Sequence, residues 1–121
     1  DDIVASYIIL ISNTPDLQFY SMNKLVSLIK DDVTQQPLVQ VTAWCLGEYG
    51  EMYSNLDDSN SDKMLPEEIA NILIKVLNYN AGLVATRYYA INALIKLMTR
   101  YPSLTDHVQM IMSVYGCNMN L

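Results

Sequence analysis

Three observations predict an all-α fold of about six helices arranged as stacked helical hairpins. Apolar residues recur at helical spacing in six successive segments. No segment shows the alternation with period two that marks a half-buried strand. The apolar pattern also returns after 45 positions, so that Leu38 falls on Leu83 and Trp44 on Tyr89. Because HEAT and armadillo units span about 40–47 residues, the sequence predicts a short α-solenoid of that type.

Composition fits a single packed domain and excludes several classes of protein. Of the 121 residues, 51% are hydrophobic and 17% charged, which excludes a disordered chain. No apolar run approaches the roughly 20 residues of a membrane span, and the start shows no secretory signal. Asp1 and Asp2 lead into an apolar segment without an initiator Met, so we expect a piece excised from a longer protein.

The charge and the cysteines indicate the kind of partner and compartment. The net charge is −6 and the seven basic residues are scattered, which argues against nucleic-acid binding. An acidic surface also disfavours nonspecific binding to phosphate or lipid headgroups. Cys45 and Cys117 lie far apart in different apolar segments, so we interpret them as buried or half-buried thiols. Two such cysteines fit a reducing cytosolic compartment.

Helix boundaries follow from prolines and capping residues. The helices are predicted at about residues 2–12, 15–30, 37–54, 66–77, 83–100 and 103–116. Pro15 and Pro37 take first helical positions, and Pro66 lies in the first turn of its helix. Thr14 and Ser103 are the expected N-caps of the second and sixth helices, and Gly116 ends the sixth. Because most connections are short, consecutive helices are expected to pack antiparallel as three hairpins.

Five of these helices show one apolar stripe each, whereas the third is apolar nearly all round from Leu38 to Leu46. The stripes predicted to be buried are Val4, Tyr7, Ile8 and Ile11; Leu17, Met22, Leu25, Val26 and Ile29; Ile69, Ile72, Leu73, Val76 and Leu77; Val84, Tyr88, Ile91, Leu94, Ile95 and Met98; and Leu104, Val108, Ile111, Met112 and Tyr115. A helix apolar on every side is buried on more than one face. We therefore predict that residues 37–54 form the inner helix of the middle hairpin.

Two glycines interrupt the third helix, and an acidic loop follows it. Gly47 and Gly50 each cost about 1 kcal/mol relative to alanine in a helix, so we expect a close approach of neighbouring side chains or a bend. A ligand-cradling glycine turn is the alternative, although no strand precedes it.

Residues 55–64, NLDDSNSDKM, are predicted to be a flexible surface loop within a single segment spanning 1–121. Asp57, Asp58 and Asp62 leave a calcium site as an alternative, but the spacing lacks the glycine and terminal glutamate of a helix-loop-helix site.

Residues able to support catalysis are scarce, and we assign no catalytic, cofactor-binding or metal-binding residue. His107 has no carboxylate, histidine or cysteine one helical turn away, so an exposed surface histidine is expected. Glu48 and Glu51 are interpreted as a solvated helix face, with paired carboxylates as the alternative.

Arg87 lies among apolar positions of the fifth helix. Ion pairing or hydrogen bonding to a neighbouring loop is the expectation for its side chain, and a phosphate contact is the alternative. The adjacent Tyr88 and Tyr89 are interpreted as core and interface anchors. We expect neither enzymatic activity nor a cofactor.

The stretch QQPLVQVTAWCLGEYG, residues 35–50, resembles the gamma-adaptin family, the large gamma subunits of the heterotetrameric clathrin adaptor complex 1. A family-like reading, QQPLVQVAAWCIGEYG, differs only at Thr42 and Leu46. The stretches DDIVASYIILIS, KLVSLIKDDV and ATRYYAINALIKLMTRY extend the resemblance over most of the chain. Alpha-, delta- and epsilon-adaptins and coatomer subunits share the solenoid but match this motif less well.

This resemblance implies a fragment of the adaptin trunk, from its later part. The trunk would hold the sigma, beta and medium chains, and the parent complex would connect Arf GTPase and membrane cargo to clathrin. It would be cytoplasmic and peripheral on trans-Golgi network and endosomal membranes and on clathrin-coated vesicles, without direct membrane insertion. No motif of the family's phosphoinositide, Arf or dileucine sites matches a position here, so the partner-binding residues stay unassigned.

The expected function is therefore that of a structural scaffold segment acting in vesicle-mediated protein transport by protein–protein interaction. One alternative is another α-solenoid coat or transport-receptor subunit. The other is a small helical ligand-binding domain or enzyme. Because an excised solenoid exposes apolar faces at its ends, we also expect some self-association.

Overall fold

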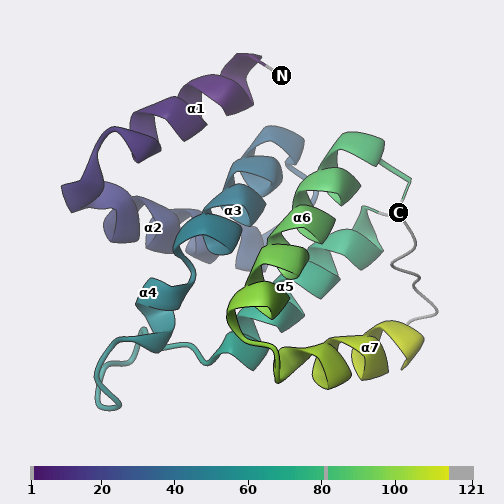
Figure 1. Ribbon diagram of the computed structural model, residues 1–121. Coiled ribbons are helices and arrows are strands. Elements are labelled where there is room, and N and C mark those ends of the chain that lie inside the picture. Colours follow the sequence, from purple (N-terminus) through teal and green to yellow (C-terminus); the bar gives the residue numbers. More distant parts are fainter. Residues whose placement is uncertain (1, 81, 115–121) are drawn as a thin grey trace.

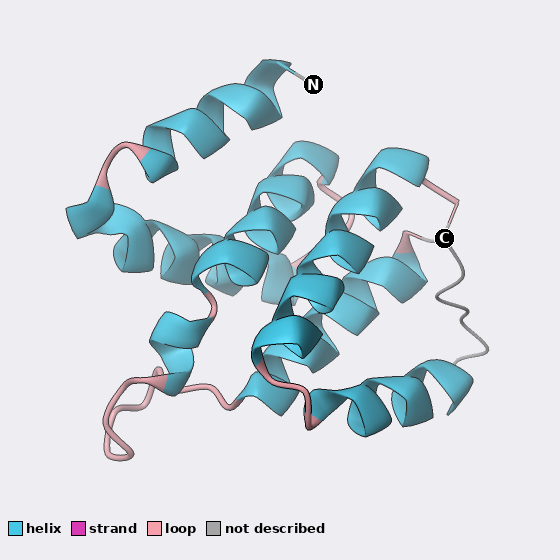
Figure 2. Cartoon of the chain, viewed as in Figure 1, coloured by secondary structure: helices cyan, strands magenta, loops and turns pink. Residues whose placement is uncertain are grey.

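The computed structural model describes residues 2–80 and 82–114, and these form helices and connecting turns with no strand (Figures 1 and 2). The elements are α1 (Asp2–Ser12), the 3₁₀ helix η1 (Pro15–Leu17), α2 (Gln18–Asp31), α3 (Gln36–Tyr49), α4 (Glu51–Ser54), α5 (Pro66–Tyr79), α6 (Val84–Arg100) and α7 (Leu104–Val114). The all-α prediction is confirmed. The predicted end of the last helix, with Tyr115, Gly116 and Cys117, lies outside the described residues.

Two predicted helices are divided in the structure. The segment 15–30 begins as η1 before it continues as α2, and the segment 37–54 is divided at Gly50 into α3 and α4. Gly50 keeps helical dihedral angles, and its N–H donates to the Leu46 carbonyl at 3.0 Å. Thr14 occupies the predicted N-cap position, at the start of η1, but its side chain makes no capping bond. Its hydroxyl donates backwards to the Leu10 carbonyl at 2.7 Å instead.

Helices α1, α3 and α6 stack in one layer, and α2, α5 and α7 pack against it (Figure 1). The antiparallel hairpins are α2–α3 and α5–α6, and α3 and α6 form the most extensive interface of the described residues. The predicted pairing of the helices into three consecutive hairpins is therefore wrong, because α3 pairs with the preceding α2 and not with the following α5. The short connection between α2 and α3 favours that pairing, whereas the longer one after α4 carries the chain round to α5.

A repeat is present, with a register slightly different from the predicted one. The helices of the second hairpin begin at Pro66 and Val84, each 48 residues after its counterpart at Gln18 or Gln36. The predicted shift was 45 positions. The apolar pattern matched the helices correctly, but its register is three residues off, slightly less than one helical turn.

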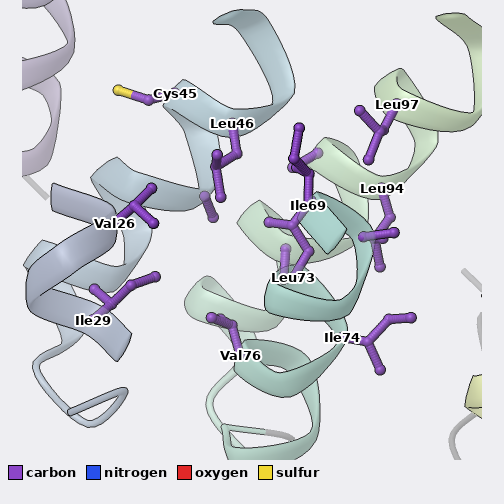
Figure 3. Close-up of a cluster of buried hydrophobic side chains, with 14 of the residues drawn as sticks. Val26, Ile29, Cys45, Leu46, Ile69, Leu73, Ile74, Val76, Leu94 and Leu97 are labelled. Atoms are coloured by element: carbon purple, nitrogen blue, oxygen red, sulfur yellow. The ribbon is translucent and has the colours of Figure 1, made fainter. Parts of the chain in front are cut away.

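Helix α3 lies at the centre of the core, as its all-round apolar sequence predicts. Its buried residues are Val39, Gln40, Val41, Thr42, Ala43, Cys45, Leu46 and Gly47. Side chains of α2, α5 and α6 converge around it, and Figure 3 shows Leu46 between Val26 of α2 and Ile69 of α5. Burial of these apolar side chains against one another is the main stabilising interaction of the fold.

Four residues predicted to be buried are exposed instead. Tyr7, Leu17, Val84 and Tyr88 expose 53%, 52%, 83% and 65% of their surface. Each belongs to a helical apolar pattern, but no helix of the described chain covers it. The predicted burial of Met112 and Tyr115 concerns side chains that the structure does not describe. The self-association expected from uncovered apolar faces stays a prediction.

The acidic segment 55–64 projects from the end of α4 (Figure 2). At its base, Ser54 donates its hydroxyl to the Met64 carbonyl at 2.9 Å. The Lys63 ammonium donates to the carbonyls of Ser54 and Leu56, at 2.9 and 2.8 Å, and pairs with Asp58 at 3.1 Å. Lys63 thus joins the two ends of the loop. The predicted flexibility of its outer part stays a prediction.

Within the described ranges, no helix combines the length and apolar character needed to cross a bilayer.

Candidate protein interface

At the interface between α3 and α6, some residues of the WCLGEYG motif lie in the core and others reach the surface. Cys45 and Leu46 are fully buried, whereas Trp44 is half-buried. Trp44 lies at the edge of a surface groove between α3 and α6. The groove is lined by Trp44, Gly47, Tyr88, Tyr89, Asn92, Ala93 and Lys96. The motif therefore contributes both to the core and to a surface.

Gly47 forms part of the groove floor because α3 and α6 approach closely there. A Cβ atom added to Gly47 would lie 2.9 Å from the Ala93 Cα and 3.1 Å from the Ala93 Cβ. The close approach expected from the glycines is thus confirmed. The ligand-cradling turn is not formed, because Gly47 lies inside α3 and Gly50 has helical dihedral angles.

Aromatic rings form the walls of the groove. Trp44 packs edge-on against Tyr49 with ring centroids 5.7 Å apart, and Tyr88 packs against Tyr89 at 6.2 Å. Asn92 also lines the groove, half-buried, and its side chain makes no hydrogen bond to any residue that the structure describes. Tryptophan and tyrosine side chains at a surface are enriched in interfaces with other proteins, and Tyr88 is exposed while Trp44 and Tyr89 are half-buried.

Two ion pairs connect α3 and α4 to α6, one of them through the groove residue Lys96. Glu48 pairs with Lys96, and Glu51 of α4 lies 3.8 Å from the Arg100 Nε. Each glutamate thus contacts a cation of α6, and the paired-carboxylate alternative has no support in these contacts. As both pairs are substantially exposed, their contribution to stability is small.

A buried polar network closes the opposite end of the α3–α6 interface. Gln40 donates its amide to the Thr86 hydroxyl at 2.9 Å, and Thr86 donates to the Gln36 side-chain oxygen at 2.5 Å. Gln36 in turn donates to Asn80 Oδ1 at 2.9 Å, and the Asn80 amide donates to the Val33 carbonyl at 3.0 Å. These bonds connect α3 with α6 and with the end of α5, and they satisfy polar groups that burial would otherwise destabilise.

Sequence reasoning missed this network. The only local signal was a pair of glutamines, Gln36 and Gln40, one turn apart in an otherwise apolar helix. Their partners lie 44 to 50 residues further along the chain.

His107 is less exposed than predicted. It is half-buried in α7, and its Nε2 lies 3.0 Å from the Asn71 Oδ1 of α5. This polar contact joins α7 to α5. The partner of His107 is an amide and not a carboxylate, which fits a structural contact rather than an acid–base pair.

Cys45 is buried as predicted, and burial raises the pKa of its thiol from 9.0 to about 12. The thiol is therefore protonated and unreactive at neutral pH. Arg87 is half-buried in α6, and its backbone N–H donates to the Leu83 carbonyl at 2.9 Å. The phosphate alternative for Arg87 stays untested.

The carboxylates of the acidic loop do not converge. Across residues 2–80 and 82–114, no three histidine, cysteine, aspartate or glutamate side chains lie close enough to hold a metal ion. Asp58 pairs with Lys63 instead, and the Asp62 N–H donates to Asn60 Oδ1 at 2.9 Å. The calcium alternative therefore has no support in this geometry.

The sequence matches the family described as the Adaptin N terminal region over residues 1–120. It is 40% identical over 123 residues to the AP-1 complex subunit gamma-like 2 of Mus musculus and over 118 residues to that of Homo sapiens, covering 100% and 96% of this chain. Identity to the AP-1 complex subunit gamma of Dictyostelium discoideum is 34% over 129 residues, again covering 100% of this chain. The chain spans only 16%, 15% and 14% of the lengths of these three relatives.

Proposed function

Because the chain belongs to the family of the Adaptin N terminal region, we propose that it is a structural scaffold segment of a clathrin adaptor large subunit. It acts in vesicle-mediated intracellular protein transport by binding other proteins and catalyses no reaction. The observation that carries this proposal is the family match over residues 1–120, which coincides with two stacked helical hairpins. Solenoids of this kind present extended surfaces to partners.

Residues 1–121 are proposed to be one segment of a longer trunk, with residues 55–64 as a flexible loop within it. The uncovered face of α1 supports this proposal, since Ile3 and Leu10 are 57% and 62% exposed. Helix α3 is covered by α1 on one side and by α6 on the other, whereas α1 has such a neighbour on one side only. A further helix of the same layer would complete its burial.

The proposed partners are the sigma, beta and medium chains of the same adaptor, with Arf GTPase, cargo and clathrin reached through the parent complex. The proposed location is the cytoplasmic surface of trans-Golgi network and endosomal membranes and of clathrin-coated vesicles. The relatives are named as subunits of AP complexes, which supports assembly with other subunits.

Co-purification of the full-length parent protein tests this proposal. A tagged parent chain is expected to bring down sigma, beta and medium adaptor chains in near-equal amounts. If it came down without them, the adaptor proposal would be wrong. Recovery of a different fixed set of partners would favour another coat or transport-receptor solenoid.

The groove lined by Trp44 and Tyr88 is the surface that we assign to contact with another subunit of that complex. Tyr88 is 65% exposed, so the substitution Tyr88→Ala removes an interface ring and leaves folding nearly unchanged. We expect at least one of the three subunits to bind more weakly by about tenfold or more. Tyr79→Ala is the matched control, because Tyr79 is 67% exposed and lies outside the groove. Equal effects of the two substitutions would contradict this assignment.

A further inference from the structure

Three serines in this chain precede an aspartate by three residues. They are Ser54 before Asp57, Ser59 before Asp62, and Ser103 before Asp106. Acid-directed protein kinases recognise an acceptor serine by a carboxylate at this position, which pairs with basic side chains in the substrate groove of the kinase. The sequence alone does not distinguish the three serines.

The structure disfavours Ser54 and Ser103 as acceptors, although Ser103 itself is exposed. Ser54 is half-buried at the end of α4, and its hydroxyl donates to the Met64 carbonyl at 2.9 Å. Ser103 directly precedes Leu104, which is only 1% exposed at the start of α7. A kinase that bound Ser103 in an extended conformation would have to pull Leu104 out of the core, which is energetically costly.

Ser59 differs from the other two serines because it lies in a fully exposed stretch of the loop. All residues from 57 to 62 are exposed, and the Ser59 hydroxyl makes no hydrogen bond to the described part of the chain. Two turn hydrogen bonds hold the local backbone, from the Asn60 N–H to the Asp57 carbonyl at 2.9 Å and from the Lys63 N–H to the Asn60 carbonyl at 3.1 Å. Figure 2 shows this loop extending away from the helices. Segment 57–62 can therefore enter a kinase groove without disturbing α4 or α5.

We propose that Ser59 is a phosphorylation site for an acid-directed serine kinase that uses ATP. The Ser59 oxygen forms a bond to the γ-phosphorus as the bond to the ADP oxygen breaks, and the hydroxyl proton passes to the catalytic base of the kinase. The phosphate adds about −1.5 to −2 charges to a loop that already carries Asp57, Asp58 and Asp62. This inference does not depend on the proposed adaptor function.

The test uses the full-length parent protein, ATP and casein kinase 2 as the acid-directed probe, with phosphopeptide mass spectrometry as the readout. We expect one phosphate within residues 54–64, located on Ser59, and its loss in Ser59→Ala. The substitution Asp62→Asn removes the recognised carboxylate and is expected to slow phosphorylation about tenfold. Ser61→Ala is the matched control, because it removes a neighbouring exposed hydroxyl and leaves Asp62 in place.

Absence of phosphate from Ser59 would overturn the proposal, and so would phosphorylation of Ser54 or Ser103 in its place. An unchanged rate in Asp62→Asn would also overturn it, because recognition would then not depend on that carboxylate. Circular dichroism of each variant checks that folding is unchanged, as expected for substitutions at exposed loop positions.

Discussion

Helices α1 and α3 are both rich in apolar residues, yet they differ sharply in burial. Leu46 and Ala43 of α3 are 0% and 1% exposed, whereas Leu10 and Ile9 of α1 are 62% and 60% exposed. Helix α3 is covered by α1, α2 and α6, whereas α1 lies mainly against α3. In a stacked repeat, the number of neighbours decides how much an apolar helix contributes to stability, and its composition alone does not.

The most direct way to test this comparison is to remove a leucine from each helix. Leu46→Ala leaves a cavity in the core and is expected to lower the free energy of unfolding by about 3 kcal/mol. Leu10→Ala is the matched control, and its expected effect is within about 0.5 kcal/mol because the side chain is already exposed. Urea unfolding of the 121-residue chain measures both values. Similar losses would mean that the α1 face is covered in solution, for example by self-association.

The next largest effect is expected in the buried polar network that links the two hairpins. Thr86→Val keeps the side-chain shape but removes the acceptor of Gln40 and the donor to Gln36. Because buried groups then lose a partner, we expect a loss of about 2 kcal/mol in the same urea measurement. Thr99→Val is the control, since Thr99 is exposed and its hydroxyl contacts only the Ile95 carbonyl of its own helix. Equal costs would show that the network contributes little to joining the hairpins.

A smaller effect is expected where α3 and α6 come closest. Gly47→Ala improves helix propensity by about 1 kcal/mol, but the new Cβ forces the helices apart at a cost of about 1–3 kcal/mol. A net loss of about 1 kcal/mol is therefore expected, measured by thermal or urea unfolding. Gly82→Ala provides the control, because nothing lies within 4 Å of the added Cβ. A Gly47→Ala variant more stable than the native chain would show that α3 and α6 can move apart without lowering the free energy of unfolding.

Local sequence signals predicted what depends on neighbours within one helix. Helix positions, the burial of α3 and the close approach at Gly47 all followed from periodicity and residue size. Which helices pair as hairpins and the buried polar network could not be predicted in this way. They depend on contacts between distant residues, such as Gln40 and Thr86, which are 46 residues apart. Tyr88 fits its helical stripe and is nevertheless exposed, since periodicity shows which face is apolar but not whether another helix covers it.

The smallest expected effect lies at the surface, in the connection that sets the α2–α3 pairing. The Thr34 hydroxyl and N–H donate to the Asp32 carboxylate and lower its pKa below 3.8. The resulting stabilisation is fully present above pH 3.8 and is lost as the pH falls through the lower pKa of the folded state. The difference in unfolding midpoint between the native chain and Asp32→Asn should therefore shrink from pH 5 to pH 3. Asp16→Asn serves as a control in another connection, and a difference for Asp32 that stayed constant with pH would mean that the charged carboxylate is not what stabilises this turn.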